Sequence, residues 1–196
     1  LTKGTGTAQN YSSDSSTGTY YKYTPWYISG CENVVIEEGV TSIGNYTFGG
    51  CSALENVYYT GDIAGWCSIS YGNFYANPMY WSENLYIGGK LIEGELIIPD
   101  GVTVIPSSAF EKCKGITSVT IPDSVTSIGY CAFYNCTGLK ELTMPVSAKI
   151  YNSQDTFGRC TNIEKVTLTK GNGTRLDYTS SSSNTTYTYY QYTPWY

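Results

Sequence analysis

A pattern of apolar residues recurs along this chain with a period of ~23 residues, and a fixed period of this length is typical of stacked arrays. It limits the fold more than any other feature of the sequence. From Cys113 to Asn135 the unit reads C-x-x-I-x-x-V-x-I-P-x-x-V-T-x-I-x-x-x-A-F-x-x, and Cys136 opens the next unit. One unit of this size cannot bury its own apolar side chains, so successive units must stack on one another. We therefore expect the chain to fold as a solenoid.

Four copies of the unit keep the same five apolar positions. They are Phe48, Cys51, Leu54, Val57 and Tyr59; Phe110, Cys113, Ile116, Val119 and Ile121; Phe133, Cys136, Leu139, Leu142 and Met144; and Phe157, Cys160, Ile163, Val166 and Leu168.

Within each unit the residues predict a strand, a turn, a second short strand and a helical turn. The Val-x-Ile segments alternate apolar and polar residues, as half-buried strands do. Pro99, Pro122 and Pro145 end these strands, because proline cannot donate a hydrogen bond to a neighbouring strand. Val-Thr-x-Ile predicts the second strand, and the Ala-Phe-x-x-x-Cys spacing favours a helical or 3₁₀ turn with Phe and Cys facing inward. Val146–Gln154 lacks this sequence pattern, and we expect an irregular turn there.

A longer repeat organises the whole chain. Leu1–Thr7 matches Leu168–Thr174, and Tyr20–Tyr27 matches Tyr189–Tyr196, so both ends of the chain carry the same block. We therefore expect one super-repeat and the opening block of the next, cut from a longer protein. The predicted parts are a cap-like block at 1–27, a first repeat at 28–60, an aromatic-rich island at 61–94, regular repeats at 95–168 and a second copy of the block at 169–196.

The island at 61–94 interrupts the period and is dense in aromatic residues. Leu85–Ile92 predicts a β-hairpin, because its central Gly-Gly pair supplies the positive φ that a tight turn needs. Exposed Tyr and Trp are frequent binding residues. An insertion also needs a small core of its own, which Trp66, Phe74 and Trp81 would supply. Both interpretations stay open.

The seven cysteines favour structural thiols. Cys51, Cys113, Cys136 and Cys160 hold one slot in successive units, where a reduced thiol packs as a small apolar group. A disulfide between neighbouring turns is the alternative, since stacked strands lie within the distance that a disulfide spans. The odd total and the parallel direction of stacked side chains favour free thiols. Without His or a CxxC pair, no zinc site is predicted.

Composition removes several classes of function. The absence of His excludes Ser-His-Asp and Cys-His catalysis and His-bound metals. Glu37 and Glu38 stand where other units carry Pro-Asp, so we interpret them as turn residues and not as catalytic carboxylates. The net charge of −5 and the lack of a Lys/Arg cluster argue against nucleic-acid binding. We predict no catalytic residue, no metal, no cofactor and no insertion of this segment into a membrane.

Ile121–Leu139, which reads I-P-D-S-V-T-S-I-G-Y-C-A-F-Y-N-C-T-G-L, closely resembles the repeat of the BspA-like, treponemal-type leucine-rich repeat proteins. Val35–Gly44 resembles the same signature, and the island and the Pro-Trp-Tyr blocks resemble segments common in such proteins from gut bacteria. Pro106 and Ser107 depart from the pattern in one unit. The resemblance implies a β-rich α/β solenoid, a leucine-rich repeat right-handed superhelix of ~23-residue units with short strands, helical or 3₁₀ turns and one irregular insertion.

The resemblance also implies a protein that is exported, attached to the bacterial envelope and without shared catalytic residues. In such a fold, polar positions that alternate with the buried ones project from the sheet face. The strip predicted in this way reads Asn33 and Val35, Asn56 and Tyr58, Glu95 and Ile97, Ser118 and Thr120, Glu141 and Thr143, and Lys165 and Thr167. From the strip and the island we select the candidate ligand-binding residues Tyr58, Tyr75, Tyr80, Trp81, Tyr86, Glu95, Thr120, Glu141, Thr143 and Lys165.

The function that we expect is adhesion or protein–protein interaction at the bacterial cell surface. The partner would be a host extracellular-matrix protein or another surface protein. Two alternatives stay open: a carbohydrate-binding module that uses the island aromatics, and a structural spacer in a larger surface protein.

Overall fold

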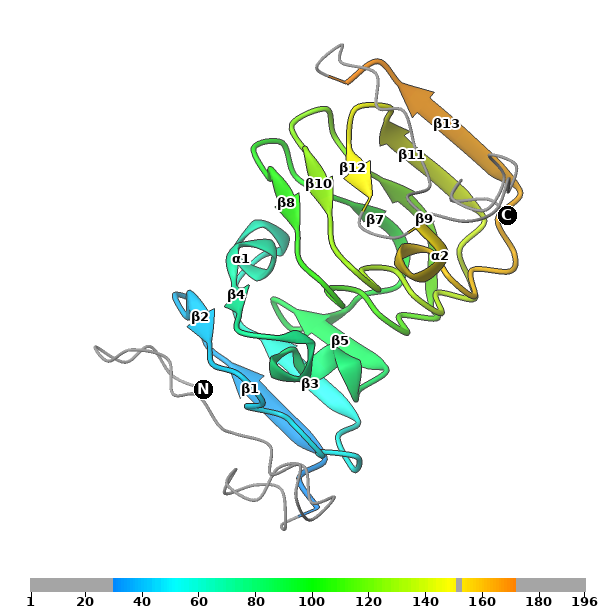
Figure 1. Ribbon diagram of the computed structural model, residues 1–196. Helices are drawn as coiled ribbons and strands as arrows, with labels where there is room; N and C mark the ends of the chain where they lie inside the picture. Colours follow the sequence, from blue (N-terminus) through cyan, green and yellow to red (C-terminus); the bar gives the residue numbers. More distant parts are fainter. Residues whose placement is uncertain (1–29, 151–152, 172–196) are drawn as a thin grey trace, which may run out of the picture.

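A computed structural model describes residues 30–150 and 153–171 of the 196-residue chain. These residues wind into successive coils, most of which have one long and one short strand (Figure 1). Strands of the same kind pair in parallel from coil to coil, which confirms the predicted solenoid with a parallel sheet on one face.

The long strands are β1 (Asn33–Ile36), β3 (Asn56–Tyr59), β5 (Asn84–Ile87), β7 (Gly94–Ile97), β9 (Ile116–Thr120), β11 (Glu141–Pro145) and β13 (Lys165–Thr169). The short strands are β2 (Ser42–Ile43), β4 (Ser70–Tyr71), β8 (Val104–Ile105), β10 (Ser127–Ile128) and β12 (Lys149–Ile150). The other elements of the described residues are β6 (Lys90–Leu91), the helices α1 (Ile63–Ser68) and α2 (Ser153–Thr156), and the 3₁₀ turns η1 (Phe74–Ala76) and η2 (Pro78–Tyr80).

The register of the long strands reproduces the sequence repeat. Asn33 lies opposite Asn56 where β1 pairs with β3, and Ser118 lies opposite Glu141 where β9 pairs with β11. Each of these steps equals one regular repeat unit, the length that separates Cys113 from Cys136. Because side chains alternate between the two faces of a strand, this register places the apolar set of the coils before β13 on the inside.

Two inward columns of the repeat form ladders through the core. The rings of Phe110, Phe133 and Phe157 stack with centroids 5.4 and 5.3 Å apart. The thiols of Cys136 and Cys160 donate to the carbonyl oxygens of Phe110 and Phe133, each at 3.1 Å. The last three of these coils are thereby joined in sequence through ring contacts and sulfur hydrogen bonds.

The prediction of free thiols is confirmed, since none of the seven cysteines forms a disulfide. Burial raises the pKa of Cys51, Cys67 and Cys113 to about 12. These thiols therefore stay neutral at neutral pH and pack as small apolar groups, with little of the thiolate that reacts.

The Ala-Phe segments of the units that end at Cys113 and Cys136 form consecutive turns and no continuous helix. They keep 3₁₀-type hydrogen bonds, as from the amide of Cys113 to the carbonyl oxygen of Phe110, and the Phe and Cys side chains face inward as predicted. Ser108 and Lys112 have positive φ, 56° and 61°, and left-handed residues at this spacing stop a helix from extending. Alternate backbone amides of the first segment instead donate to carbonyl oxygens of the second, as between parallel strands. In the last described coil, α2 supplies the expected helical turn.

The segment that we expected to be an irregular island completes a coil of its own. β4 pairs with β2, and β5 pairs with β3 with Asn84 opposite Asn56. This coil is longer than a regular unit because α1, η1 and η2 are inserted between its strands. The predicted hairpin is confirmed: β5 pairs antiparallel with β6 across Gly88 and Gly89, which have φ of 56° and 78°.

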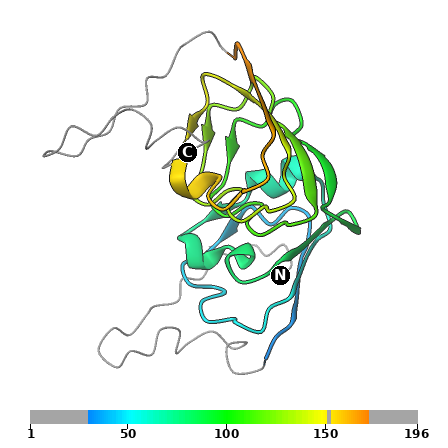
Figure 2. The same ribbon diagram turned by 90° about the vertical axis from the view of Figure 1, so that its right-hand side faces the viewer.

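The hairpin divides the long-strand sheet into two halves. The ladder of β1, β3 and β5 ends at β6, and a second ladder of β7, β9, β11 and β13 follows. α1 lies between the short strands β4 and β8 of the two halves (Figures 1 and 2). Trp66 on α1 is fully buried, and its Nε1 donates to the carbonyl oxygen of Ala109 at 2.9 Å. The helix thereby joins both halves into one apolar core.

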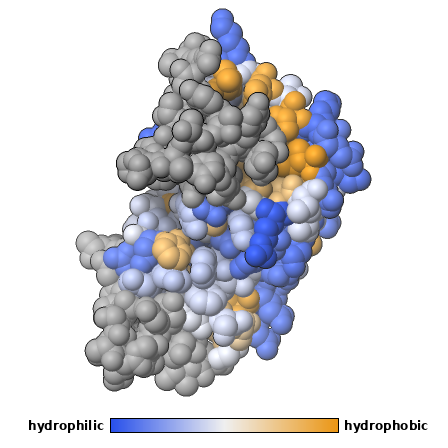
Figure 3. Space-filling view, turned by 45° about the vertical axis from the view of Figure 1, so that its right-hand side comes forward, coloured by the Kyte–Doolittle hydropathy of each residue, from blue (hydrophilic) through white to orange (hydrophobic). Residues whose placement is uncertain are grey.

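Two predictions about the C-terminal units are wrong. Val146–Gln154 contains β12, which pairs with β10 with Ile150 opposite Ile128, so the unit keeps its second strand after a short turn. Leu168 was assigned to an inward slot but is 54% exposed, because β13 is the last strand of its sheet within the described residues. Apolar side chains accordingly reach the surface in the upper part of the molecule, where β13 lies (Figure 3).

The predicted blocks at 1–27 and 169–196 lie outside the described residues, apart from 169–171. Their role as caps, and the division of the chain into five parts, stay predictions.

Gly138 lies where the backbones of two coils approach closely. A Cβ at Gly138 would lie 2.2 Å from the carbonyl oxygen of Lys114 and 2.9 Å from that of Ile116. We expect Gly138→Ala to lower the free energy of unfolding by about 1–3 kcal/mol, because the coils must separate to admit the methyl group. Urea unfolding measures the loss. Ala53→Ser, in the exposed equivalent slot of an earlier unit, is the control; equal losses in both variants would contradict this close packing.

Candidate functional site

An asparagine ladder crosses the exposed face of the first half-sheet. The side-chain Nδ2 of Asn56 donates to Oδ1 of Asn33 at 2.9 Å, and Nδ2 of Asn84 donates to Oδ1 of Asn56 at 3.1 Å. Each amide is oriented by its neighbours, so the polar edge of this face is ordered before any ligand arrives.

An aromatic row runs beside the ladder. Val35, Tyr58 and Tyr86 lie opposite one another, and the rings of Tyr58 and Tyr86 stack with centroids 4.6 Å apart. Val35 is half exposed. The sequence groups Tyr86 with the island aromatics, whereas the structure places it on the sheet face. The signal was in the sequence, since Asn84–Ile87 keeps the Asn-x-Tyr wording of Asn56–Tyr59.

The second half-sheet continues the face with charged, hydroxyl and apolar side chains. The register aligns Glu95, Ser118, Glu141 and Lys165 in one row and Ile97, Thr120, Thr143 and Thr167 in the next. Nζ of Lys165 lies 3.3 Å from the Glu141 carboxylate, and both side chains are mostly exposed. Such a surface pair contributes about 0–1 kcal/mol, so the charges remain available to a partner. Ile97 is 53% exposed.

The remaining candidates, Tyr75, Tyr80 and Trp81, line a groove with a volume of about 920 Å³. We call it the aromatic groove. Tyr130 and Tyr134, which sequence reasoning missed, also line it, together with the acidic residues Glu111 and Asp155. Tyr130 and Tyr134 are four residues apart around an inward Ala-Phe pair, and a helical turn also places residues at this spacing on one side, so the spacing could have found them. None of the sheet-face candidates lines this groove.

The island rings of the groove pack against one another. The Tyr80 ring lies 5.0 to 5.5 Å from the rings of Phe74, Tyr75 and Trp81, centroid to centroid. Phe74 was expected in a local core but is 39% exposed at the groove, and Trp81 is only half-buried. Of the three predicted core aromatics, Trp66 alone is fully buried.

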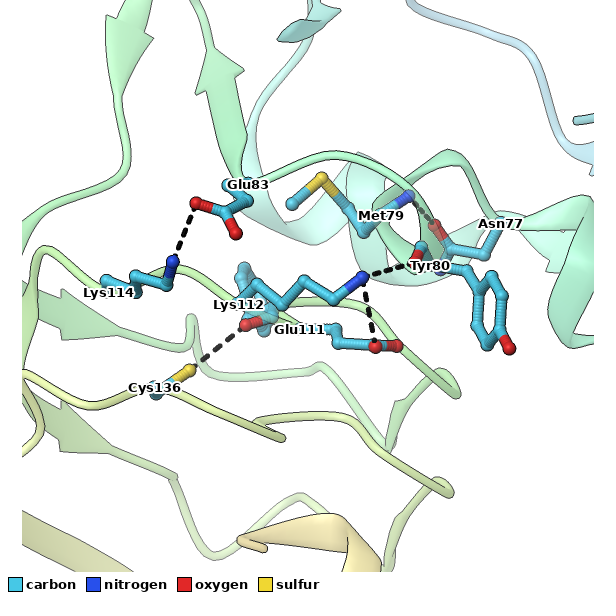
Figure 4. A network of polar contacts seen from close by, with 9 residues as sticks. Asn77, Met79, Tyr80, Glu83, Glu111, Lys112, Lys114 and Cys136 are labelled. Carbon is cyan, nitrogen blue, oxygen red and sulfur yellow. Dashed lines mark hydrogen bonds and ion pairs between the residues drawn. The ribbon is translucent and has the colours of Figure 1, made fainter. Parts of the chain in front are cut away.

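Glu111 brings a buried carboxylate to the aromatic groove. The residue is 4% exposed, and its Oε1 lies 3.5 Å from Nζ of Lys112, which also donates to the carbonyl oxygen of Tyr80 (Figure 4). Burial raises the pKa of the Glu111 carboxyl, although Ser108 and Lys112 partly oppose this shift. Oε2 has no hydrogen-bond partner among the described residues. Buried polar atoms are normally bonded, so this oxygen marks a place where a donor is missing.

Polar contacts fix the position of η2 against the second half of the solenoid. Nδ2 of the buried Asn77 donates to the carbonyl oxygen of Ser107 at 2.9 Å. Lys114 forms an ion pair with Glu83 at 2.7 Å, seen beside the Lys112 contacts in Figure 4. The groove is therefore built on the same junction that joins the two half-solenoids.

Residues 30–150 and 153–171 give little support for a metal site, a catalytic carboxylate pair or a membrane-spanning helix. No group of three His, Cys, Asp or Glu side chains there is arranged to hold a metal ion. Glu37 and Glu38 are exposed and lie in the turn after β1. Within the same residues, no helix has the length and apolar character needed to cross a membrane.

Three solved structures resemble this chain. A leucine-rich repeat protein of Treponema pallidum is 22% identical, with a TM-score of 0.39, and the match covers 70% of this chain and 58% of that one. A leucine-rich cell surface protein of Faecalibacterium prausnitzii is 16% identical, with a TM-score of 0.34 and coverage of 76% and 62%. A leucine-rich repeat protein of Bacteroides ovatus is 21% identical, with a TM-score of 0.36 and coverage of 71% and 43%. The chain thus spans less than two thirds of each structure.

No curated protein sequence matches the chain. The family described as "BspA type Leucine rich repeat region" matches it in six copies over residues 14–80 and 82–191. With this match and the stacked parallel coils, the chain belongs to the BspA-type leucine-rich repeat family.

Proposed function

We propose that this chain is a non-enzymatic adhesion module that binds proteins of host or microbial surfaces through the exposed face of its long-strand sheet. Membership of a leucine-rich repeat family supports a protein-binding role. The observation that carries the proposal is the face itself, where the long strands present aligned rows of side chains. Solenoids commonly use such extended surfaces for binding.

The first half-sheet supplies the anchor of the proposed contact. Tyr58 and Tyr86 are already stacked, so a partner that packs on them loses little further side-chain entropy. Tyrosine is also enriched among the residues that dominate protein–protein binding energy. The exposed Val35 adds apolar area beside the pair. Glu95, Glu141 and Lys165 on the second half would then orient the partner through charge.

We further propose that the protein is exported and attached to the bacterial envelope, where host matrix proteins are within reach. The family supports this location. The composition agrees with it, since charged residues make up only 14% of a chain that is rich in Tyr.

Binding to immobilised host matrix proteins, mucin and gut polysaccharides, followed by interferometry, tests the proposal. We expect saturable binding to at least one protein. The double variant Tyr58→Ala/Tyr86→Ala should weaken that binding roughly tenfold or more, because each central tyrosine typically contributes more than about 1 kcal/mol. Tyr130→Ala, on the aromatic groove, is the matched control and should bind as the unchanged chain does.

Unchanged affinity of the double variant would contradict the sheet-face proposal. A signal confined to polysaccharides would support the carbohydrate-binding alternative, and silence across the panel would favour a spacer.

A further inference from the structure

We propose that the aromatic groove is a second binding site and that it takes a guanidinium group, presented by an arginine of a protein partner. This site goes beyond the proposed sheet-face function, because it uses other residues and another side of the coils. The groove combines a buried carboxylate, electron-rich rings, cations of the chain itself and a predominantly negative charge.

The Glu111 carboxylate supplies the acceptor. It is 4% exposed, and neither Oε2 nor the Ser108 hydroxyl, which lowers the pKa of this carboxyl, has a partner of ordinary hydrogen-bond geometry among the described residues. A donor that reaches Oε2 from the groove therefore competes with the Ser108 hydroxyl alone among the contacts that act on that oxygen. Lys112 compensates only the other oxygen and is itself held by the Tyr80 carbonyl. A charged donor suits this acceptor, because charge-assisted hydrogen bonds are about twice as strong as those between neutral groups.

The tyrosines around the groove already hold cations. Nζ of Lys112 lies 5.5 Å from the Tyr80 ring centre, and the guanidinium carbon of Arg159 lies 5.6 Å from that of Tyr134. A cation within about 6 Å of a ring centre is attracted by the negative face of the ring. The ring of Tyr130 is 40% exposed and lines the same groove. A planar guanidinium can stack on such a ring while its N–H groups bond to a carboxylate.

The charge around the groove is predominantly negative. Asp155 lines it beside Glu111, whereas Lys112 is the one Lys or Arg among the described lining residues and is already engaged. The pKa of Cys131 is raised to about 12, chiefly by burial, and that of Tyr130 to about 12, chiefly by the neighbouring Cys131. Burial opposes charge of either sign there, so the preference for a cation rests on the two carboxylates of Glu111 and Asp155 beside one engaged lysine. A cationic ligand complements the groove, and an acidic one does not.

The same geometry argues against a neutral sugar as the occupant. Sugar rings stack on open, flat aromatic faces, but the Tyr80 ring is surrounded by three other rings and by Lys112. The Tyr134 ring faces Arg159. Small open surfaces beside a buried carboxylate suit one compact cation better than an extended glycan.

An NMR titration of the purified chain at low ionic strength tests the site. The probes are N-acetyl-arginine methylamide and its neutral isostere N-acetyl-citrulline methylamide, and the signal followed is the indole N–H of Trp81. We expect saturable shifts with the arginine probe and an affinity for the citrulline probe that is weaker by roughly tenfold or more, the difference a charged hydrogen bond typically makes.

Two variants locate the effect. Glu111→Gln keeps the size of the side chain and should weaken the arginine probe roughly tenfold. Tyr130→Ala alters an exposed side chain that the fold does not require, and it should weaken the probe as well. Asp100→Asn removes an exposed carboxylate outside the groove and should leave affinity unchanged. Tyr58→Ala/Tyr86→Ala should also leave it unchanged, which separates this proposal from the sheet-face proposal.

Equal affinity for arginine and citrulline would overturn the assignment, and so would normal arginine binding by both Glu111→Gln and Tyr130→Ala. Saturation by a neutral oligosaccharide without any response to arginine would instead identify a glycan site.

Discussion

Replacement of Trp66 by Ala is expected to lower the free energy of unfolding by about 3–5 kcal/mol, the usual cost of removing a buried Trp side chain. Trp66 is fully buried in the core, and its indole N–H holds the Ala109 carbonyl oxygen of the other half-solenoid. The variant loses the packed ring and leaves that carbonyl without its donor. For a domain of this size the change corresponds to a melting temperature lower by roughly 6–20 °C. Thermal and urea unfolding followed by circular dichroism measure it.

Trp66→Phe separates the two contributions. It keeps an aromatic ring but removes the N–H, so we expect a loss of about 1–3 kcal/mol, the cost of an unsatisfied buried acceptor together with imperfect packing. Trp81→Phe, at a half-buried position, is the matched control and should cost less. If Trp66→Ala cost no more than Trp81→Ala, α1 would not be what joins the two halves.

Phe133→Ala is the second substitution with a large expected effect, also about 3–5 kcal/mol. Phe133 is fully buried between Phe110 and Phe157, in a ladder with interplanar angles of 15° and 1°. Its removal opens a cavity in the middle of a stack, and the rings on both sides lose a partner. Urea unfolding gives the loss.

The interior position of Phe133 gives this prediction its control. Phe157→Ala removes the last ring of the described ladder, so it should cost less than Phe133→Ala. Tyr130→Ala, at a 40% exposed position in the same segment, should change stability by about 0.5 kcal/mol or less. Equal losses for Phe133→Ala and Tyr130→Ala would mean that the ladder does not stabilise the fold.

Much of the fold could be predicted because the repeat is local and regular. The period of the apolar pattern places Asn33 opposite Asn56 and Ser118 opposite Glu141, as the strand register has it. The prediction that the slot shared by Cys136 and the neighbouring units holds free thiols is also correct. The spacing of the apolar residues and their alternation with polar ones determine these features. Both are visible in the sequence without knowledge of which coils are in contact.

The features that could not be predicted depend on changes in coil length and on contacts between distant segments. The strand at Asn84–Ile87 lies more than one regular period after its partner, so a search at a fixed period passes over it and assigns Tyr86 to the island. The aromatic groove combines 74–81, Glu111 and 130–134, which come together only after the enlarged coil stacks on the next ones. The positive φ of Ser108 and Lys112, which stops the expected turn from extending into a helix, has no simple sequence signature.

The most direct test of the central claim is to find which side of the solenoid touches a bound protein. A photo-crosslinking residue, p-benzoylphenylalanine, would replace Tyr86 in one variant and Tyr130 in another, each mixed with a protein ligand identified by interferometry. The sheet-face proposal predicts a covalent adduct from position 86 and little or none from position 130. An adduct from position 130 alone would contradict it.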